Sequence, residues 1–301
     1  MATGNSDVSA WIPELWGMTV LSHLKAQLVA ARLVNRDYDT PVANEGDTIN
    51  VPLPPSLSAG DKTAGSAVVY TAVSAATTPV VLNKHKYVAF QVDDIAKMQA
   101  RPDVLDNYGK SAAIALAEAI ETATLDEYTN AAAAVGTPGT DLAKASLLSA
   151  RKTLMDAKVP PSDSRFAIIS TKDYENILSD LSTTTAGSMN ADRSPLREGS
   201  AGRLYGFDIY ESQLAPSVAG SPVTTHGIAG HRDAVVLVTR PLTAPPAGSG
   251  VISAVVSDPD VGITMRVMLG FNQTYMQQNV TYDVLFGTKT VRSSFMVDLE
   301  S

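Results

Sequence analysis

The spacing of apolar positions at the start of the chain predicts a helix. Residues 11–35 favour an amphipathic helix after a polar leader, because leucine and alanine recur there every three or four residues. These positions are Leu21, Leu24, Leu28 and Ala31. An apolar helix face near the start of the chain has to be buried against another surface. We therefore expect it to pack on its own domain or on a neighbouring molecule.

Alternating apolar and polar positions predict a β-rich excursion over residues 46–92. Residues 48–53 and 88–92 each alternate with a period of two, as half-buried strands do. Residues 54–67 lie between them and are rich in Pro, Gly, Ser and Ala, which is typical of a mobile tip. A two- or three-stranded ribbon of this kind is marginal alone, so it needs a partner surface.

Residues 103–134 predict one long helix. Asp103 follows Pro102 and can cap the first turn. Ten alanines between positions 112 and 134 favour the helical state, and Gly-Thr-Pro-Gly at 136–139 ends it. At 1.5 Å per residue such a helix would be about 48 Å long.

The rest of the chain mixes both periods. We expect helices at 141–158 and 171–181, strands at 165–170, 204–211 and 233–240, a polar loop at 183–201, and β-rich segments from 251 to the end. Helices and strands alternate in the middle and segregate at the ends. The predicted fold class is therefore α+β.

The composition excludes several kinds of site and several classes of protein. The chain has 301 residues and no cysteine, which excludes disulfides, thiolate catalysis and cysteine-type zinc sites. The net charge is −8, with no run of Lys or Arg of the kind that grips nucleic acid. Apolar stretches stop short of the roughly 18–20 residues that a membrane span needs, and no secretory signal is visible.

Histidine spacing gives no metal motif. The four histidines are His23, His85, His226 and His231. His226 and His231 lie five apart, and no further acidic or histidine partner is nearby in the sequence. We expect the two to pack in a loop. Asn272 and Asn279 begin glycosylation sequons, but without a secretion signal we interpret them as ordinary strand polar residues.

Motifs of nucleotide binding and of nucleophilic catalysis are absent from the sequence. It contains no P-loop, no dinucleotide fingerprint and no nucleophile elbow. Ser22 and Lys25 match a short Ser-x-x-Lys pattern by chance on the leading helix. The chain is not expected to be an enzyme.

Paired carboxylates are the remaining candidates for acid–base chemistry. They are Asp93 with Asp94, Glu118 with Glu121, Asp126 with Glu127, and Asp258 with Asp260. Asp93 and Asp94 point to opposite faces of a strand. Glu118 and Glu121 share a helix face, which we interpret as solvated or in contact with another subunit. No catalytic, cofactor-binding or metal-binding residue is predicted.

Five stretches, taken in order, carry a resemblance to a known family. They are IPELWGMTVLSHL…LVAARLVNRDYD with EGDTINVPLP, KHKYVAFQVDDIAKMQARPDVLDNYGKSAAIALAEAIE, ARKTLMDAKVPPSDSRFAIISTKDYENIL, GRLYGFDIYESQLAP, and AVVLVTRPL with the closing strands. The chain resembles the major capsid proteins of tailed double-stranded-DNA phages, which have the Hong Kong-97-like fold.

The resemblance implies a domain layout. Residues 1–45 would be an N-terminal arm, 46–92 an extended β-loop that lies across an adjacent subunit, and 141–250 an axial domain. Residues 93–140 and about 251–301 would form a peripheral domain with the 103–134 helix as its spine. The strand at 204–211 would lie in the axial core, with its aromatic residues there for packing.

The resemblance also implies a function. The chain would form pentamers and hexamers of an icosahedral virion shell around loosely confined phage DNA, assembled in the host cytoplasm without cofactor or membrane. The arm begins near Met1, so we expect either a separate scaffolding protein or none, beside a portal. A Lys–Asn cross-link at Lys84 and Asn83 is not carried over. Two alternatives stay open: an encapsulin shell, and a hydrolase or binding module whose site is assembled from residues far apart in the sequence.

Overall fold

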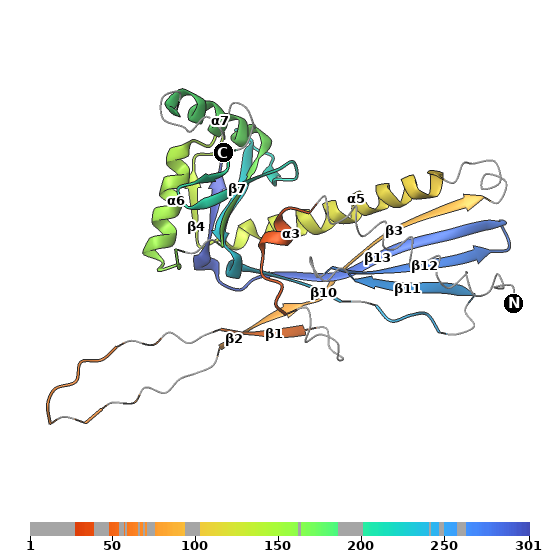
Figure 1. Ribbon diagram of the computed structural model, residues 1–301, viewed down its shortest axis with the longest axis horizontal. Coiled ribbons are helices and arrows are strands. Elements are labelled where there is room, and N and C mark those ends of the chain that lie inside the picture. The colour runs from red at the N-terminus through yellow and green to blue at the C-terminus, as the bar shows by residue number, and fades with distance from the viewer. Residues whose placement is uncertain are drawn as a thin grey trace, which may run out of the picture.

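Two large sheets and two helical layers organise the chain. The computed structural model describes residues 28–38, 48–53, 57, 59–65, 67–68, 70, 76–93, 103–161, 164–185, 201–240, 242–246, 250–257 and 263–301. Its described strands form a two-, a five- and a seven-stranded sheet. A long helix lies along the five-stranded sheet, and the seven-stranded sheet stands at one end of this unit with its own helices (Figure 1). The α+β class is confirmed.

The five-stranded sheet is built around its longest strand. Its members are β3 (Lys84–Asp93), β10 (Val235–Arg240), β11 (Val251–Ser257), β12 (Thr264–Asn272) and β13 (Gln277–Thr290). β13 pairs antiparallel with β12, β10 and β3. β11 closes the far edge beside β12.

Helix α5 (Asp103–Leu125) covers this sheet with small side chains. Ala113, Leu116, Ala117 and Ile120 are each no more than 1% exposed and join one core with Val280, Tyr282 and Phe286 of β13. Alanine lets the helix approach the sheet closely, and one turn of α3 (Ala30–Leu33) packs against the same core. Of the expected helix at 11–35, residues 11–27 lie outside the described residues.

The expected helix at 103–134 is wrong at its C-terminal end. α5 stops at Leu125, a 3-10 helix η2 (Asp126–Asn130) follows, and β4 (Ala133–Gly136) is a strand. β4 pairs parallel with β14 (Met296–Glu300). A Cβ at Gly136 would clash with the carbonyl oxygen of Glu300, so the strands approach closely there. Pairing with a distant strand overrides the helical preference of the alanines.

The seven-stranded sheet mixes parallel and antiparallel pairs. Its order is β4, β14, β9 (Thr224–His231), β5 (Arg165–Ser170), β7 (Phe207–Ser212) and β6 (Arg203–Leu204), and β8 (Ser217–Val218) pairs with β9. Helices α6 (Lys144–Asp156) and α7 (Thr171–Thr185) share one core with it. Val297 and Leu299 of β14 face that core, which leaves the alternate residues on the other face.

The strand expected at 204–211 is partly wrong, because it is a tight hairpin. Tyr205 and Gly206 have φ of 50° and 87°, as a two-residue turn between paired strands requires. Phe207 is fully buried, whereas Tyr205 and Tyr210 are more than a third exposed. Of the three aromatic side chains in this stretch, only that of Phe207 therefore packs in the core.

Strands β1 (Thr48–Leu53) and β2 (Ala76–Val81) form a separate antiparallel hairpin. Val51 and Val80 anchor it on Val236 and Val238 of β10. The described residues between the two strands are all exposed and extend far from both sheets (Figure 1). The strand predicted at 48–53 is confirmed.

Strand pairing divides the chain differently from the expected segment boundaries. β3 lies in the five-stranded sheet and not in the extended loop expected over 46–92, and β10 joins the same sheet. β4 and β14 lie in the seven-stranded sheet. Among the described residues, no helix is both long enough and apolar enough to cross a membrane.

Candidate functional site

The carboxylate of Glu121 joins the leading segment to α5. Its oxygens accept hydrogen bonds from the backbone N–H of Ala30 at 2.8 and 2.9 Å and from that of Val29 at 3.2 Å. Glu121 is 2% exposed, and burial raises its pKa while these hydrogen bonds lower it. The expectation that Glu118 and Glu121 act alike is wrong, since only Glu118 is exposed.

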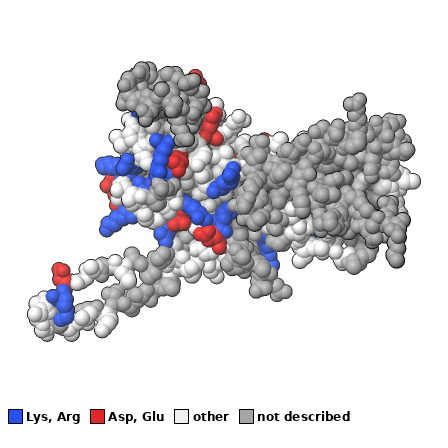
Figure 2. Space-filling view, in the orientation of Figure 1, with Lys and Arg blue, Asp and Glu red and all other residues white. Residues whose placement is uncertain are grey.

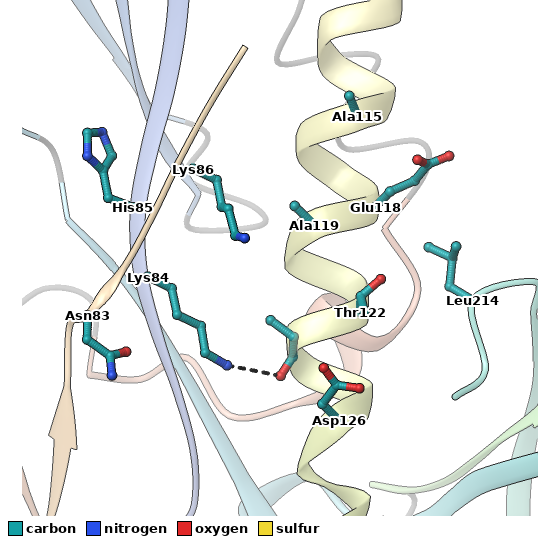
Figure 3. A pocket seen from close by; sticks show the side chains of 11 residues that line it. Asn83, Lys84, His85, Lys86, Ala115, Glu118, Ala119, Thr122, Asp126 and Leu214 are labelled. Atoms are coloured by element: carbon teal, nitrogen blue, oxygen red, sulfur yellow. Dashed lines mark hydrogen bonds between the residues drawn. The ribbon is translucent and has the colours of Figure 1, made fainter. Parts of the chain in front are cut away.

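A groove of about 600 Å³ lies between β3 and α5 (Figure 3). Lys84 and Lys86 point toward the helix from the strand, and Glu118 lines the helix side. The Nζ of Lys84 donates to Thr288 Oγ1 at 2.8 Å and to the carbonyl oxygen of Ala123 at 3.5 Å. Lys84 therefore ties β3 and β13 to the end of α5.

On the other side of β3, His85 meets a buried ion pair. Its Nε2 lies 3.1 Å from Oδ2 of Asp283, whose side chain is 2% exposed. Arg266 donates to both oxygens of Asp283, with Nε at 3.1 Å from Oδ1. This bidentate contact has the geometry of a strong charge-assisted ion pair. His85 thus links β3 to β13, and Arg266 links β12 to the same carboxylate.

A polar cluster lies where η2 meets the seven-stranded sheet. Nδ1 of His226 is 2.9 Å from Oδ2 of Asp298, and the ring of Tyr128 stacks on His226 with centroids 4.2 Å apart. Glu300 lies opposite His226 in the strand register. Burial raises the pKa of Asp298, His226 lowers it, and Glu300 raises it. Burial and the negative charge of Asp298 also raise the pKa of Tyr128.

Asp173, another buried carboxylate, holds Ser301. Oδ2 of Asp173 accepts from Ser170 Oγ at 2.6 Å and from Ser301 Oγ at 3.0 Å, and Oδ1 accepts from the backbone N–H of Leu142 at 2.9 Å. Because a carboxylate can accept several hydrogen bonds, one buried side chain here fastens three separate segments.

Comparison with models of protein families shows which family the chain belongs to. The model of a family described as phage capsid protein matches residues 75–291. The chain belongs to the phage capsid protein family. No curated protein matches it significantly.

Solved structures agree on the fold of this capsid protein. A structure from Mycobacterium phage Che8 is 22% identical, covers 91% of each chain and gives a TM-score of 0.66. The capsid of Ralstonia phage GP4 is 10% identical, with 91% of this chain and 88% of that chain covered and a TM-score of 0.61. An encapsulin complex from Synechococcus elongatus is 13% identical, with 85% and 82% covered and a TM-score of 0.51. The resemblance to phage major capsid proteins is confirmed.

His231 and Glu127, two further residues named from the sequence, both form hydrogen bonds within the subunit. Nδ1 of His231 accepts from the backbone N–H of Asp233 at 3.2 Å, and burial lowers its pKa. Glu127 accepts from the backbone N–H and the hydroxyl of Thr290. Several candidates lie outside the described residues: Ser22, His23, Lys25, Asp94, Asp258 and Asp260. Of Asp93 only the backbone, in β3, is described.

His226 and His231 belong to strand β9 and not to a loop, which corrects that expectation. The sequons begin in strands, as expected: Asn272 ends β12 and Asn279 lies in β13.

Sequence reasoning missed the partners of Glu121 and His226. Asp298 and Glu300 lie more than 70 positions after His226, and Ala30 lies 91 before Glu121. The alternation of Val297, Asp298 and Leu299 was a usable signal, because it predicts polar side chains on one face of a strand. The clusters hold segments of the capsid protein together through hydrogen bonds and charge pairing.

Proposed function

We propose that this capsid protein self-assembles into the icosahedral shell that encloses packaged DNA in a phage virion, and that assembly takes place in the host cytoplasm. One observation carries the proposal. Between β1 and β2 the side chains of Leu57, Val68 and Tyr70 are 70%, 58% and 92% exposed. Large apolar side chains left exposed on a segment that projects from the subunit favour contact with another molecule. Membership of a shell-forming family makes a second copy the natural partner.

The mechanism is head-to-tail association. The projecting segment of one subunit would lie on a different surface of the next, which is a heterologous contact. Such contacts close into rings of five or six when the rotation between subunits allows it. Covering each large apolar side chain contributes about 1.5–3 kcal/mol, so a few of them per interface matter.

The strand pairing suggests roles for the elements. Residues 1–45 would act as the arm, fastened through Glu121, and the segment between β1 and β2 as the extended loop within 46–92. The five-stranded sheet with α5 as its spine would be the peripheral domain. The seven-stranded sheet with α6 and α7 would be the axial domain, so its borders take in β4 and β14 as well as most of 141–250.

We infer a structural and not a catalytic role, with DNA confined loosely. The net charge of −8 disfavours tight binding to phosphates. On the face drawn in Figure 2, basic and acidic side chains of the described residues are interspersed around the seven-stranded sheet. A separate scaffolding protein and a portal are proposed as partners on the family resemblance alone.

Replacing the three exposed apolar side chains tests the proposal. We expect the triple variant Leu57→Ser, Val68→Ser, Tyr70→Ser to give no shells in negative-stain electron microscopy and only small species in sedimentation. Its melting temperature should change by less than about 2 °C, because all three side chains are exposed and lie outside the cores of the subunit.

The matched control changes small and polar positions of the same segment. Ala59→Ser, Thr63→Ser and Ala67→Ser together should still form shells, since all three are exposed and carry little apolar surface. Normal shells from the triple serine variant would contradict the proposal. If that variant lost its cooperative melting, Tyr70→Ser alone would serve, with fewer shells expected at equal concentration.

The likeness to an encapsulin is one of fold alone. The genes beside this one discriminate the two kinds of shell. Terminase and portal genes are expected for a phage head. A neighbouring cargo-enzyme gene, with shells that hold that enzyme and no DNA, would contradict the phage assignment while leaving shell assembly intact.

A further inference from the structure

Three side chains from two paired strands form a compact group on one face of the seven-stranded sheet. His226 of β9 lies directly opposite Glu300 of β14, and Asp298 is two residues earlier on the same face. One ligand atom of each residue lies within 4.8 Å of the others. His226 and Asp298 are 8% and 6% exposed, while Glu300 is half-buried and keeps a route to solvent.

One oxygen in this group lacks a partner. Oδ1 of Asp298 is buried and accepts no hydrogen bond from the residues that the structure describes. Its other oxygen, Oδ2, already contacts His226. Leaving a buried acceptor without a hydrogen bond is unfavourable, and more so when the acceptor is charged. A cation bound by both oxygens of this carboxylate would give Oδ1 a partner.

The charges point to a dication. The side chains of Asp298 and Glu300 place two carboxyl groups side by side on this face. Within the described part of the chain, neither Asp298 nor Glu300 forms an ion pair with a lysine or arginine. A divalent cation would balance both carboxylates.

We propose that His226, Asp298 and Glu300 bind a divalent transition-metal ion of the zinc class, with water completing its coordination. One imidazole nitrogen with two carboxylate oxygens suits Zn²⁺, whereas Mg²⁺ and Ca²⁺ prefer oxygen alone.

The distances fit such an ion. Ligand atoms about 2.05 Å from a metal stand about 2.9 Å apart at right angles and about 3.4 Å apart in a tetrahedron. The contact of 2.9 Å between His226 and Asp298 is within this range. The third atom needs a movement of roughly 1 Å or a little more, because no pair exceeds 4.8 Å.

The bound ion would fasten β9 to β14 near the end of the chain. Tyr128 of η2 stacks on His226, so the end of α5 would be held to the seven-stranded sheet through the same point. The site goes beyond shell formation and does not depend on it, because all three ligands come from one subunit.

Metal titration of the full-length protein tests the site. After chelation and dialysis, we expect equilibrium dialysis to show one Zn²⁺ bound per chain, and Co²⁺ to give visible absorption bands that Zn²⁺ abolishes. Glu300→Gln should weaken Zn²⁺ binding by about tenfold or more. Glu211→Gln is the control: Glu211 is an exposed glutamate on β7 of the same sheet, so its replacement should leave affinity unchanged.

Three results would overturn the site. They are no Zn²⁺ uptake by the unaltered chain, equal affinities in the two glutamine variants, and displacement of Zn²⁺ by an equal concentration of Mg²⁺. If Glu300→Gln lost its cooperative melting, Asp298→Asn would take its place in the same titration, with the same weakening expected.

Discussion

At the scale of single residues, one buried carboxylate distinguishes two glutamates that look alike in the sequence. Glu118 and Glu121 are three positions apart on α5. Glu118 faces the open groove, whereas Glu121 lies against the start of α3 and accepts from the N–H groups of Val29 and Ala30. A helix start has N–H groups without helical partners, and Glu121 supplies acceptors for them.

Glu121→Ala should destabilise the folded subunit. It would leave buried N–H groups without acceptors, so we expect a loss of about 1–3 kcal/mol in the free energy of unfolding, measured by urea denaturation. Glu118→Ala is the control, because Glu118 is exposed, and its effect should stay within about 0.5 kcal/mol. Equal effects of the two substitutions would contradict the assigned contact.

The pH dependence of stability gives a second test of Glu121. Burial raises its pKa above the ordinary 4.5, so the folded state holds the proton more tightly than the unfolded state. Its contribution to stability is therefore complete below pH 4.5 and declines as pH rises through the raised pKa. The free energy of unfolding of the unaltered chain, minus that of Glu121→Gln, should be larger near about pH 4 than at about pH 7. The opposite trend would mean that the backbone hydrogen bonds outweigh desolvation.

At the scale of elements, periodicity located most helices and strands and misplaced their ends. The alternation at 48–53 correctly predicted β1, and the apolar spacing near 141–158 correctly predicted α6. The predicted helix is wrong at residues 126–134, because β14 offers β4 a parallel partner that the local sequence does not contain. The strand predicted at 204–211 is partly wrong, because a turn with positive φ interrupts it.

Gly206→Ala tests that turn. Gly206 has φ of 87°, and a Cβ there would meet no atom within 4 Å, so the cost is backbone strain alone. We expect a loss of about 1–2 kcal/mol in the free energy of unfolding. Gly60→Ala is the matched control, since its Cβ is equally free and its φ is not in the left-handed region. It should change stability by less than about 0.5 kcal/mol.

At the scale of the whole molecule, the two sheets are assembled from segments far apart in the chain. β3 pairs with β13 almost 200 positions later, and β10 joins the same sheet from between α7 and β11. The extended hairpin rests on β10 through Val51 and Val80. Leu57, Val68 and Tyr70 of its projecting segment are exposed, which is why we expect assembly to depend on that segment.

The sequence by itself determined the α+β class, most of the helices and strands, and the resemblance to phage capsid proteins. These follow from local periodicity, turn residues and the order of segments along the chain. Only the tertiary structure decided which strands share a sheet, that Glu121 is buried, and that His226 lies beside Asp298 and Glu300. Strand pairing and burial depend on contacts between distant positions, and spacing along the sequence does not encode them.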